Sequence, residues 1–441
     1  MSNGFALCIK TFGCQMNVYD SLFMDKILNN IGYNSVDSYD QADVIILNTC
    51  HIREKATEKV FSELGRVKQA MIAQKKEKIW VVVAGCVAQA EGQEIKRRAP
   101  IVDAVVGPQS IHTLPEVLTK LRRKEVTETM RLNFDPIEKF DFIGTKGVSD
   151  NPVSAFLSIQ EGCDKFCTYC VVPYTRGQEY SRPVPEIMRE AIALVNSGMK
   201  EITLLGQNVN GYVGKLEDRN VSLGELLLML KDIDGLERIR YTTSHPSDMH
   251  DTLYEAHEYH DKIMPFLHLP VQSGSDKILR SMNRKHTAND YLKIIKKLKD
   301  NCPTIKFSSD FIVGFPGETQ SDFMDTMNLV EEVGYFQAYS FKYSKRPGTP
   351  GNDYPNQIED EEKLRRLYLL QDLLRKQQLE ANKSMEGQTV RVLFDKKKTD
   401  KVGGKTPYFQ SVYMDDMSLY KQTVDLIVEE GLQSSLRCKI L

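Results

Sequence analysis

The chain has 441 residues, enough for two or three domains with sizeable hydrophobic cores. Hydrophobic residues make up 41% and charged residues 27%, as in ordinary soluble globular proteins. The net charge of −2 excludes a global basic field for nucleic acid, so any RNA contact must be local. Lys10 interrupts the only early apolar stretch, and no later run is long enough to span a membrane. We therefore expect neither a signal peptide nor a membrane partner.

The sequence contains nine cysteines. Without an export signal they indicate a reducing compartment, where thiols bind metals or act in catalysis rather than form disulfides. We expect a cytoplasmic protein.

The first third of the chain alternates apolar runs with helical patterns, which predicts a parallel, Rossmann-like α/β sheet. A helix should open near Asn17, and a long helical pattern spans about 53–76. The expected strands cover residues 5–12, 44–50, 79–86 and 104–107.

Cys14, Cys50 and Cys86 each lie at or just past the end of one of these strands, 36 residues apart. Parallel strands end on the same edge of a sheet, where ligands bind, so the three thiols should meet there. A single free cysteine is usually a buried small hydrophobe, but three in one position favour a three-cysteine cluster site. The remaining cysteines are interpreted as structural: Cys8, Cys302 and Cys438.

A second group of cysteines follows the apolar stretch 155–159. Cys163, Cys167 and Cys170 are spaced CxxxCxxC, so one loop could wrap a metal centre. Structural zinc and electron-transfer clusters normally take four ligands. Three thiols suit a [4Fe–4S] cube with one open iron, and the spacing resembles the signature of radical S-adenosylmethionine (SAM) enzymes, in which that iron binds SAM. A zinc or redox loop with a distant fourth ligand is the alternative.

The linker 132–152 mixes Pro, Gly and charged residues, so we place a boundary there between a domain of residues 1–140 and one of 150–383. Six strand–helix units then predict a partial (β/α)6 barrel with its active face at the carboxyl ends of the strands. The strand candidates are 155–160, 201–206, 238–243, 265–270, 305–313 and 338–343. The helix candidates are 184–197, 222–231, 248–260, 287–300 and 319–333.

Polar and glycine-rich segments fall at those carboxyl ends. Each segment alone is an ordinary turn, but together they predict a cofactor pocket. They are 206–208, 243–246, 270–275, 314–318 and 342–348. His245 and His268 lie in the same region and are interpreted as satisfied core or supporting residues rather than metal ligands.

The last part of the chain changes pattern. Residues 358–383 read as one amphipathic helix, acidic first and basic later, which we expect to pack on the barrel. Short strands at 389–394, 408–413, 423–428 and 436–440 predict a small β-barrel over 384–441. Lysines in loops beside Tyr408 and Phe409 suit RNA binding, with solvated loops as the alternative. These lysines are Lys396, Lys397, Lys398, Lys401 and Lys405.

Taken together, the chain resembles the radical SAM methylthiotransferases. The motifs that carry the resemblance to the branch acting on isopentenyladenosine are Gly13-Cys14-Gln15-Met16-Asn17, Asn48-Thr49-Cys50-His51-Ile52-Arg53-Glu54-Lys55-Ala56 and Lys59-Val60-Phe61-Ser62-Glu63-Leu64-Gly65. The branch acting on threonylcarbamoyladenosine usually has a Gly-Cys-Lys-Val-Asn type motif, and the branch that modifies a ribosomal protein also differs. Gly403 to Phe409 lacks the Asn-rich segment common in the C-terminal RNA-binding (TRAM) barrel of the family.

The resemblance implies a reaction that adds a methylthio group to C2 of N6-isopentenyladenosine, at position 37 beside the anticodon of tRNA, with two SAM per turnover. The C2–H is not acidic, so a cofactor must supply a radical. The implied cofactors are two [4Fe–4S] clusters and SAM, one cluster on Cys163, Cys167 and Cys170 and the other, which holds the sulfur, on Cys14, Cys50 and Cys86. An electron donor such as flavodoxin or ferredoxin is implied, and we expect a monomer.

Site residues follow from these positions. The expected SAM contacts are Tyr169, Gln207, Ser244, Gln272, Ser273, Gly314 and Glu318. The expected substrate contacts are Arg176 and Gln178, just after the cysteine loop, and Lys396, Lys397, Lys398 and Lys405, which should hold the anticodon stem-loop. Phe12 and Phe315 are candidates for an apolar pocket around the isopentenyl group, with a place in the hydrophobic core as the alternative for both.

Three alternatives remain open. One is a methylthiotransferase acting on threonylcarbamoyladenosine. Another is a radical SAM methyltransferase, which would need no sulfur-bearing second cluster. The third is an RNA-bound iron–sulfur electron carrier, although such a carrier has no use for the polar rim of the barrel.

Overall fold

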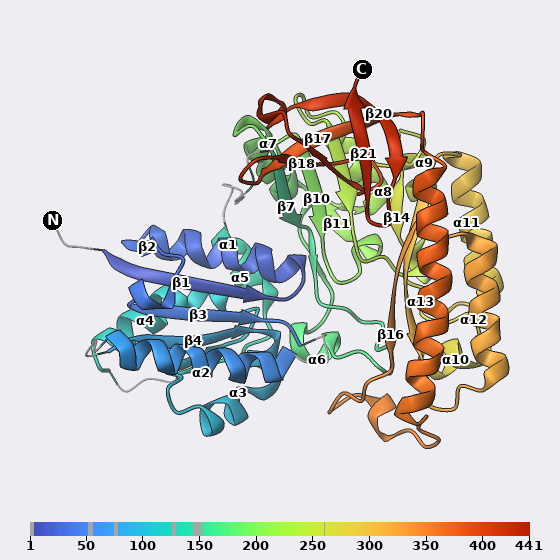
Figure 1. The fold of residues 1–441 in the computed structure, drawn as a ribbon. Helices are drawn as coiled ribbons and strands as arrows, with labels where there is room; N and C mark the ends of the chain where they lie inside the picture. Colours follow the sequence, from blue (N-terminus) through green and yellow to red (C-terminus); the bar gives the residue numbers. More distant parts are fainter. Residues whose placement is uncertain are drawn as a thin grey trace. The chain divides into compact units, whose positions relative to one another are not determined.

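The computed structural model describes residues 4–51, 56–74, 78–125, 129–143, 151, 153–259 and 261–441, and it forms two compact units (Figure 1). Unit 1 comprises Met1–Asp150, Gln160–Asp164 and Cys170–Arg182. Unit 2 comprises Asn151–Ile159, Lys165–Tyr169 and Pro183–Leu441. The division into three domains stays a prediction. In the described ranges, no helix combines the length and apolar character needed to cross a membrane.

Unit 1 is built on a six-stranded parallel sheet with the order β2-β1-β3-β4-β5-β6, in agreement with the predicted fold class. The strands are β1 (Phe5–Phe12), β2 (Tyr33–Ser35), β3 (Val44–Thr49), β4 (Trp80–Gly85), β5 (Ala104–Val106) and β6 (Met130–Arg131). The helices are α1 (Gln15–Asn29), α2 (Ala56–Gln74), α3 (Cys86–Arg98), α4 (Leu114–Arg122), α5 (Pro136–Ile143) and α6 (Val172–Arg176). A short antiparallel pair, β8 (Gln160–Glu161) and β9 (Tyr180–Ser181), flanks the cysteine loop. The 3-10 helices are η1 (Tyr39–Gln41) and η2 (Ile111–Thr113).

All four predicted strands of this sheet are confirmed as β1, β3, β4 and β5. Alternate residues of β3 and β4, such as Ile45 and Val81, pack against Leu64 of α2 and Ile95 of α3 in one buried cluster. Strands covered on both faces read as continuous apolar runs, which is why the sequence identifies them well. The helix predicted at 53–76 is present as α2, but its two ends lie outside the described residues. The predicted linker contains α5, and its remainder from 144 to 150 lies outside them too.

Unit 2 contains six parallel strands in chain order, the predicted partial barrel. They are β7 (Ser154–Ser158), β10 (Glu201–Leu205), β13 (Arg238–Tyr241), β14 (Phe266–His268), β15 (Lys306–Val313) and β16 (Gln337–Lys342). They form two sheets of three, β13-β10-β7 and β14-β15-β16, and a single parallel bridge between Ile239 and Ile263 joins β13 to the segment before β14. A hairpin of β11 (Val213–Leu216) and β12 (Arg219–Ser222) is inserted after β10.

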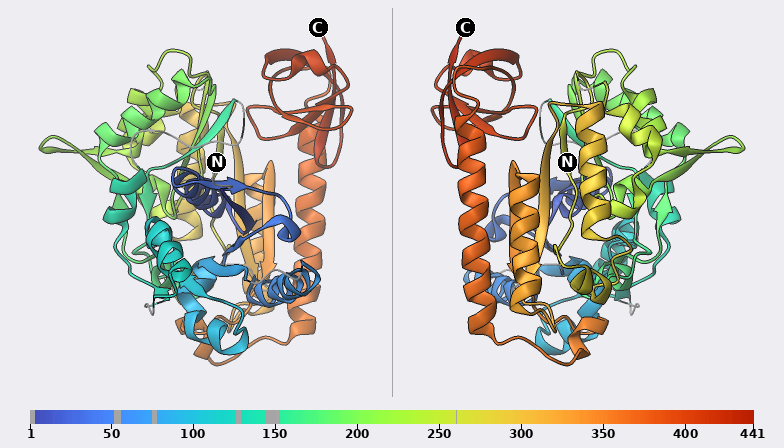
Figure 2. Two further views of the ribbon diagram at one scale, coloured as in Figure 1. Left: turned by 90° about the vertical axis from the view of Figure 1, so that its left-hand side faces the viewer. Right: turned by 90° about the vertical axis from the view of Figure 1, so that its right-hand side faces the viewer.

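The helices of unit 2 agree with the prediction in all but two places. Near 248–260, η4 and a shorter helix replace one long helix, and α10 was not predicted. The helices are α7 (Val184–Asn196), α8 (Leu223–Leu230), α9 (Asp251–Ala256), α10 (Asp276–Ser281), α11 (Ala288–Asn301), α12 (Gln320–Val333) and α13 (Asp360–Lys383). The 3-10 helices are η3 (Val209–Gly211), η4 (Pro246–Asp248), η5 (Pro350–Asp353) and η6 (Met417–Leu419). Figure 2 shows α13 running beside α12 and leading into the small C-terminal barrel.

The C-terminal barrel is closed in the order β17-β18-β19-β21-β20. Its strands are β17 (Thr389–Lys397), β18 (Val402–Lys405), β19 (Ser411–Met414), β20 (Thr423–Gly431) and β21 (Ser435–Ile440). The prediction that the lysines all lie in loops is wrong. Lys396 and Lys397 belong to β17 and Lys405 ends β18, because Gly403 and Gly404 let β18 pair closely with β17. Lys398 and Lys401 do lie in the connection.

Two buried arginines attach the small barrel to the amino ends of the parallel strands. Arg238 of β13 donates to the carbonyl oxygens of Lys405 and Arg391 at 2.8 and 2.7 Å. Arg240 donates to the carbonyl of Pro407 at 2.6 Å and lies 4.0 Å above the ring of Phe409. The two barrels of unit 2 therefore share a buried, hydrogen-bonded interface.

Four buried charges join separate segments of unit 1. Lys139 of α5 donates to Asp20 of α1 at 2.7 Å and to Glu161 of β8 at 2.9 Å. Arg176 of α6 donates to Asp20 at 2.8 Å and also to Glu161. Burial alone would raise the pKa of Asp20, but Lys139 and Arg176 outweigh it and hold the pKa below its usual value. The ionised Asp20 thus stabilises the fold above its unfolded pKa of about 3.9, and this contribution is lost as the pH falls through the folded pKa.

We predict that Lys139→Met lowers the free energy of unfolding by about 3–5 kcal/mol, because it leaves two buried carboxylates against one cation. Thermal and denaturant unfolding measure the loss. The matched control is Lys120→Met, since Lys120 pairs with Glu116 at 2.5 Å in a solvent-exposed position. That loss should stay below about 1 kcal/mol. Equal, small losses in the two variants would contradict a stabilising role for the buried charges.

Candidate active site

The strand register places Cys14, Cys50 and Cys86 at one edge of the sheet in unit 1. Phe12 pairs with Thr49, and Thr49 pairs with Gly85, across β1, β3 and β4. Cys50 and Cys86 directly follow two of these paired residues, and Cys14 lies two residues after the third. The backbone N–H of Cys50 donates to the carbonyl of Phe12 at 2.8 Å. The predicted juxtaposition at the strand ends is therefore present.

Glycines let the three chain segments approach one another. A Cβ atom on Gly13 would lie 2.7 Å from the Cβ of Cys50, which is closer than side chains tolerate. Gly85 has φ of +89°, and a Cβ there would lie 2.6 Å from the carbonyl oxygen of Thr49. Cys14 and Cys86 thus each follow a position where only glycine fits without a shift, and Cys50 lies against the first of these glycines.

The electrostatic environment favours thiolate at one cysteine and resists it at another. A hydrogen bond with Cys50 and the charge of Arg176 lower the pKa of Cys14 to about 6, although burial opposes them. Burial raises the pKa of Cys86, and Arg176 opposes that rise by charge and hydrogen bonding. Cys14 also caps α1 and Cys86 begins α3, where the helix dipole stabilises negative charge.

These donors fit a [4Fe–4S] cluster. Three thiols on neighbouring strand ends, one of them with a lowered pKa, offer one soft ligand to each of three irons. In such a cube each thiolate binds a different iron, so the three sulfur atoms need not converge on one point. In keeping with that, no three Cys, His, Asp or Glu side chains among the described residues converge as they would on a single metal ion.

Two asparagines at this edge form hydrogen bonds that the sequence analysis did not predict. Asn17 Nδ2 donates to Asn48 Oδ1 at 3.1 Å, and Asn48 Nδ2 donates to the Asn17 carbonyl at 2.8 Å. The Asn17 side chain also accepts from the backbone N–H of Cys14. They tie the start of α1 to the end of β3, and the only signal in the sequence is their place next to cysteine in the motifs.

The CxxxCxxC loop has no regular structure from Gly162 to Phe166. In unit 1, Gly162 has φ of +79°, and a Cβ there would collide with the carbonyl oxygen of Gln178. The backbone N–H of Cys163 donates to the carbonyl of Gly177 at 3.2 Å. In unit 2, Cys167 is buried and its Sγ accepts from Arg284 Nη1 at 3.7 Å. Arg284, which the sequence patterns missed, also donates to the carbonyl of Pro270.

The predicted SAM contacts lie just past the carboxyl ends of consecutive strands of unit 2, or beside them. Gln207 follows β10, Ser244 follows β13, Gln272 and Ser273 follow β14, and Gly314 and Glu318 follow β15. Gln272 has φ of +77°. Its backbone N–H donates to the carbonyl of Asp310, and its carbonyl accepts from the backbone N–H of Ile312, at 3.0 Å each. Tyr169 packs beside Phe315 and Tyr343. Their binding of SAM stays a prediction.

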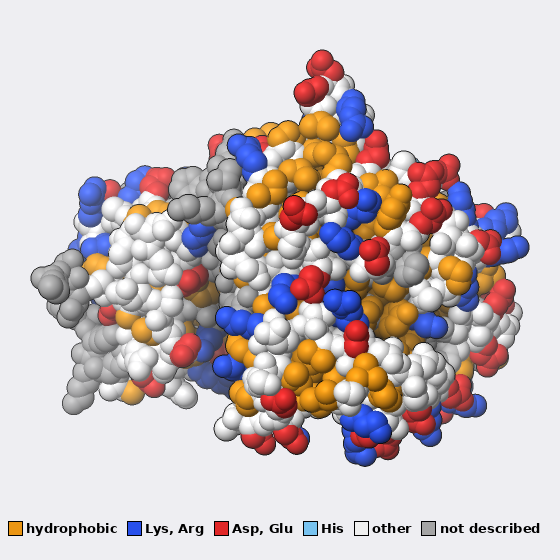
Figure 3. Space-filling view, turned by 90° about the horizontal axis from the view of Figure 1, so that it is seen from above, with side chains coloured by type: hydrophobic (Ala, Val, Ile, Leu, Met, Phe, Trp, Pro, Cys, Tyr) orange, Lys and Arg blue, Asp and Glu red, His pale blue; other side chains and the backbone are white. Residues whose placement is uncertain are grey.

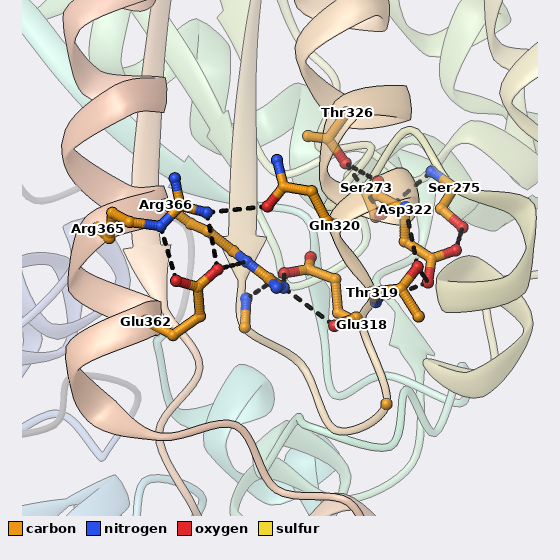
Figure 4. Close-up of polar contacts among 12 residues, drawn as sticks. Ser273, Ser275, Glu318, Thr319, Gln320, Asp322, Thr326, Glu362, Arg365 and Arg366 are labelled. Carbon is orange, nitrogen blue, oxygen red and sulfur yellow. Dashed lines mark hydrogen bonds and ion pairs between the residues drawn. The ribbon is translucent and has the colours of Figure 1, made fainter.

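Figure 4 shows that two of these side chains are bonded within the protein. Glu318 accepts from the backbone N–H of Gly314 at 2.7 Å and from Arg366 at 2.6 Å. Ser273 is fully buried and its hydroxyl lies 3.2 Å from that of Thr326 (Figure 4). Both side chains therefore stabilise the turns of the rim. The sequence could not distinguish this structural role from direct contact with SAM.

Several buried polar side chains at the same rim have atoms that lack a hydrogen-bond partner in the described structure. Within the described structure, Ser244 Oγ, His245 Nε2 and both ring nitrogens of His286 are buried without a hydrogen-bond partner. Burial and the charge of Arg284 lower the pKa of His286 to about 3 and hold that of His245 far below its ordinary value, so both rings are neutral at physiological pH. Unsatisfied polar atoms at such a rim fit a site whose ligand supplies the missing bonds.

The predicted substrate contacts have diverse environments. Arg176 is held by Asp20 and Glu161 beside the cysteine edge, whereas Gln178 is exposed. Lys405 is partly buried and donates to Ser411 Oγ at 2.8 Å, and burial lowers its pKa. Their contact with RNA stays a prediction. Phe315 is fully buried in a core cluster, which agrees with the alternative interpretation of this residue as part of the core.

Comparison with known families matches two parts of the chain. Residues 6–107 match the uncharacterized protein family UPF0004. Residues 157–330 match the radical SAM superfamily. The first match covers most of the sheet, including the three edge cysteines, and the second covers the CxxxCxxC loop and most of the partial barrel.

Two solved structures share the fold at low sequence identity. TsrM from Kitasatospora setae, a radical S-adenosylmethionine methyltransferase, superimposes with a TM-score of 0.60 at 12% identity, covering 79% of this chain and 75% of that chain. OxsB, a cobalamin-dependent S-adenosylmethionine radical enzyme, gives a TM-score of 0.53 at 11% identity, covering 82% of this chain and 56% of that chain. These likenesses concern the fold alone.

Much more similar relatives match almost the whole chain. The tRNA-2-methylthio-N(6)-dimethylallyladenosine synthase of Neorickettsia sennetsu is 57% identical over 434 residues, which covers 98% of this chain and 92% of that protein. The protein of the same name from Wolbachia pipientis subsp. Culex pipiens is 57% identical over 436 residues and 98% of each chain. The resemblance inferred from the cysteine motifs is confirmed, and the chain belongs to the family of tRNA-2-methylthio-N(6)-dimethylallyladenosine synthases within the radical SAM superfamily.

Proposed function

We propose that this chain is the methylthiotransferase that modifies C2 of N6-isopentenyladenosine beside the anticodon of tRNA, with SAM and two [4Fe–4S] clusters. One observation carries the proposal. The chain combines a CxxxCxxC loop with a second cysteine triad at a sheet edge, and it matches relatives named for this reaction over nearly its full length. A radical SAM methyltransferase would need no sulfur-bearing second cluster, and an electron carrier would have no use for the polar rim of the barrel.

The position of each group of residues indicates its proposed role. Cys163, Cys167 and Cys170 would hold the cluster that binds SAM, and the triad on β1, β3 and β4 would hold the second cluster. When bound, the first cluster supplies the electron that cleaves SAM, and the second supplies the sulfur. The chain's own contribution is to orient SAM at the rim through backbone and polar groups after β10, β13, β14 and β15, and to exclude water from the reacting atoms.

The C-terminal barrel supplies local cationic groups for RNA. Lys397 lies 4.4 Å above the ring of Tyr420, and Lys398 lies 4.1 Å above the half-exposed ring of Tyr413. Such pairs offer both a cation for phosphate and a ring for stacking. Figure 3 shows Lys, Arg, Asp and Glu side chains interspersed on the face seen there, without a continuous basic surface. RNA binding would therefore depend on a few local groups.

The remaining partners are proposed by analogy with the same family. An electron donor such as flavodoxin or ferredoxin would reduce the SAM cluster. The enzyme would act as a monomer in the cytoplasm, with its lysines on the anticodon stem-loop of the tRNA.

The first prediction from this proposal concerns iron. Anaerobically reconstituted protein should carry about eight irons, four in each cube. The combined variant Cys14→Ala, Cys50→Ala and Cys86→Ala should retain about half of that iron, because the loop cysteines remain. The matched control is Cys8→Ala, since Cys8 is a fully buried cysteine inside β1. Full iron content in the triple variant would rule out the second cluster at this edge.

The second prediction concerns the substrate. Anticodon stem-loops carrying isopentenyladenosine, adenosine or threonylcarbamoyladenosine are compared as substrates by mass spectrometry of the product nucleosides. Methylthiolation should be at least about tenfold faster on the isopentenyl form, because an apolar pocket loses binding energy when the group is absent. Preference for the threonylcarbamoyl form would move the chain to the sister branch. Labelling of a ribosomal protein instead would overturn the tRNA assignment.

A further inference from the structure

The sheet formed by β14, β15 and β16 has two distinct faces. Phe307, Phe311 and Val313 of β15 are buried in the core that includes residues of α11, α12 and α13. The alternate residues of β15 lie on the opposite, inner face of the partial barrel, because successive side chains point to opposite faces of a sheet. By register, Asp310 is paired with Tyr339 and Ile312 with Phe341, so these four side chains share the inner face.

Two large aromatic side chains on this inner face are accessible to solvent. Tyr339 is 48% exposed and Phe341 is 52% exposed, although both lie on a strand paired inside unit 2. Among the described strands, β15 alone pairs with β16, which is the last of the six strands. Exposed apolar surface of this kind, rimmed by polar groups, marks a binding surface.

The polar groups beside the two rings are fixed by hydrogen bonds. His268 of β14 lies 2.9 Å from the hydroxyl of Ser308 through Nδ1 and 3.7 Å from Asp310 through Nε2. The rings of His268 and Tyr339 meet edge to face at 6.4 Å. The Tyr339 hydroxyl accepts from Gln337 at 2.7 Å. Asp310 remains 31% exposed, so its carboxylate can accept a further bond from a ligand.

The small C-terminal barrel bounds this face at the amino ends of the strands. Phe266 of β14 meets Phe409 edge to face at 5.5 Å, in one cluster with Phe336. Arg240, beside them, donates to the carbonyl oxygens of Thr406 and Pro407. A ligand therefore reaches the inner face from the carboxyl ends, where the predicted SAM contacts lie.

On the basis of the proposed function, we infer that this inner face holds the N6 substituent of the target adenosine and sets the substrate preference. Phe341 and Tyr339 pack on the branched dimethylallyl group, which is apolar and matches their ring faces. Asp310 accepts a hydrogen bond from the N6–H, the one donor that an N6-alkylated adenine keeps at that nitrogen. The same carboxylate repels the acidic threonylcarbamoyl group, so it also rejects the competing nucleoside.

The test compares variants on stem-loops with isopentenyladenosine and with plain adenosine. Phe341→Ala and Tyr339→Ala should each reduce the ratio of kcat/KM for the two substrates by about tenfold or more. Phe341→Leu, which keeps apolar volume, should retain most of the ratio. Asp310→Asn should raise the rate on threonylcarbamoyladenosine relative to wild type. The matched control is Tyr368→Ala, since Tyr368 is a 61% exposed aromatic residue on α13.

A second readout separates this inference from folding and from the proposed function. Cleavage of SAM in the absence of RNA should be the same in all variants, because the rim and the cysteines are unchanged. If wild type prefers isopentenyladenosine and the alanine variants keep its ratio, the inference is overturned alone. If wild type does not modify the isopentenyl substrate, the proposed function fails and the inference fails with it.

Discussion

The buried charges of Lys139, Arg176, Asp20 and Glu161 are the constraint on which the candidate chemistry depends. Asp20 lies six residues after Cys14, and Glu161 lies two residues before Cys163. Arg176 lies six residues after Cys170. The two cations balance the two carboxylates with almost no solvent access, so losing any one member leaves a buried charge unpaired. Helix α1, which follows Cys14, and the flanks of the CxxxCxxC loop are thereby held together within unit 1.

A second constraint operates in unit 2. Arg238 and Arg240 attach the C-terminal barrel to β13, and Phe409 packs on Phe266 at the amino end of β14. The element proposed to hold RNA is thus built onto the barrel that would hold SAM. We infer that a ligand enters the inner face of β14–β16 from the carboxyl ends, because the C-terminal barrel packs at the amino ends. This geometry gives the aromatic pair on β16 a reason to be exposed.

The sequence pattern predicts where parallel strands end, but it does not show which charged side chains pair in the folded protein. Parallel strands end at one edge, so Cys14, Cys50 and Cys86 could be placed together from pattern alone. The partners of Arg176 could not be predicted. Asp20 lies 156 residues away, and in the sequence it looks like an ordinary charged residue of a helix. β18 was missed because glycine is depleted in strands, whereas the lack of Cβ atoms at Gly403 and Gly404 permits close strand contact.

The most direct test of the account is mass spectrometry of tRNA nucleosides from three strains: one with the intact gene, one without it, and one with Cys14→Ala. The account predicts 2-methylthio-N6-isopentenyladenosine in the first strain only. In the other two, unmodified isopentenyladenosine should accumulate in its place. The same level of the methylthio nucleoside in all three strains would contradict both the reaction and the role of the edge cysteines.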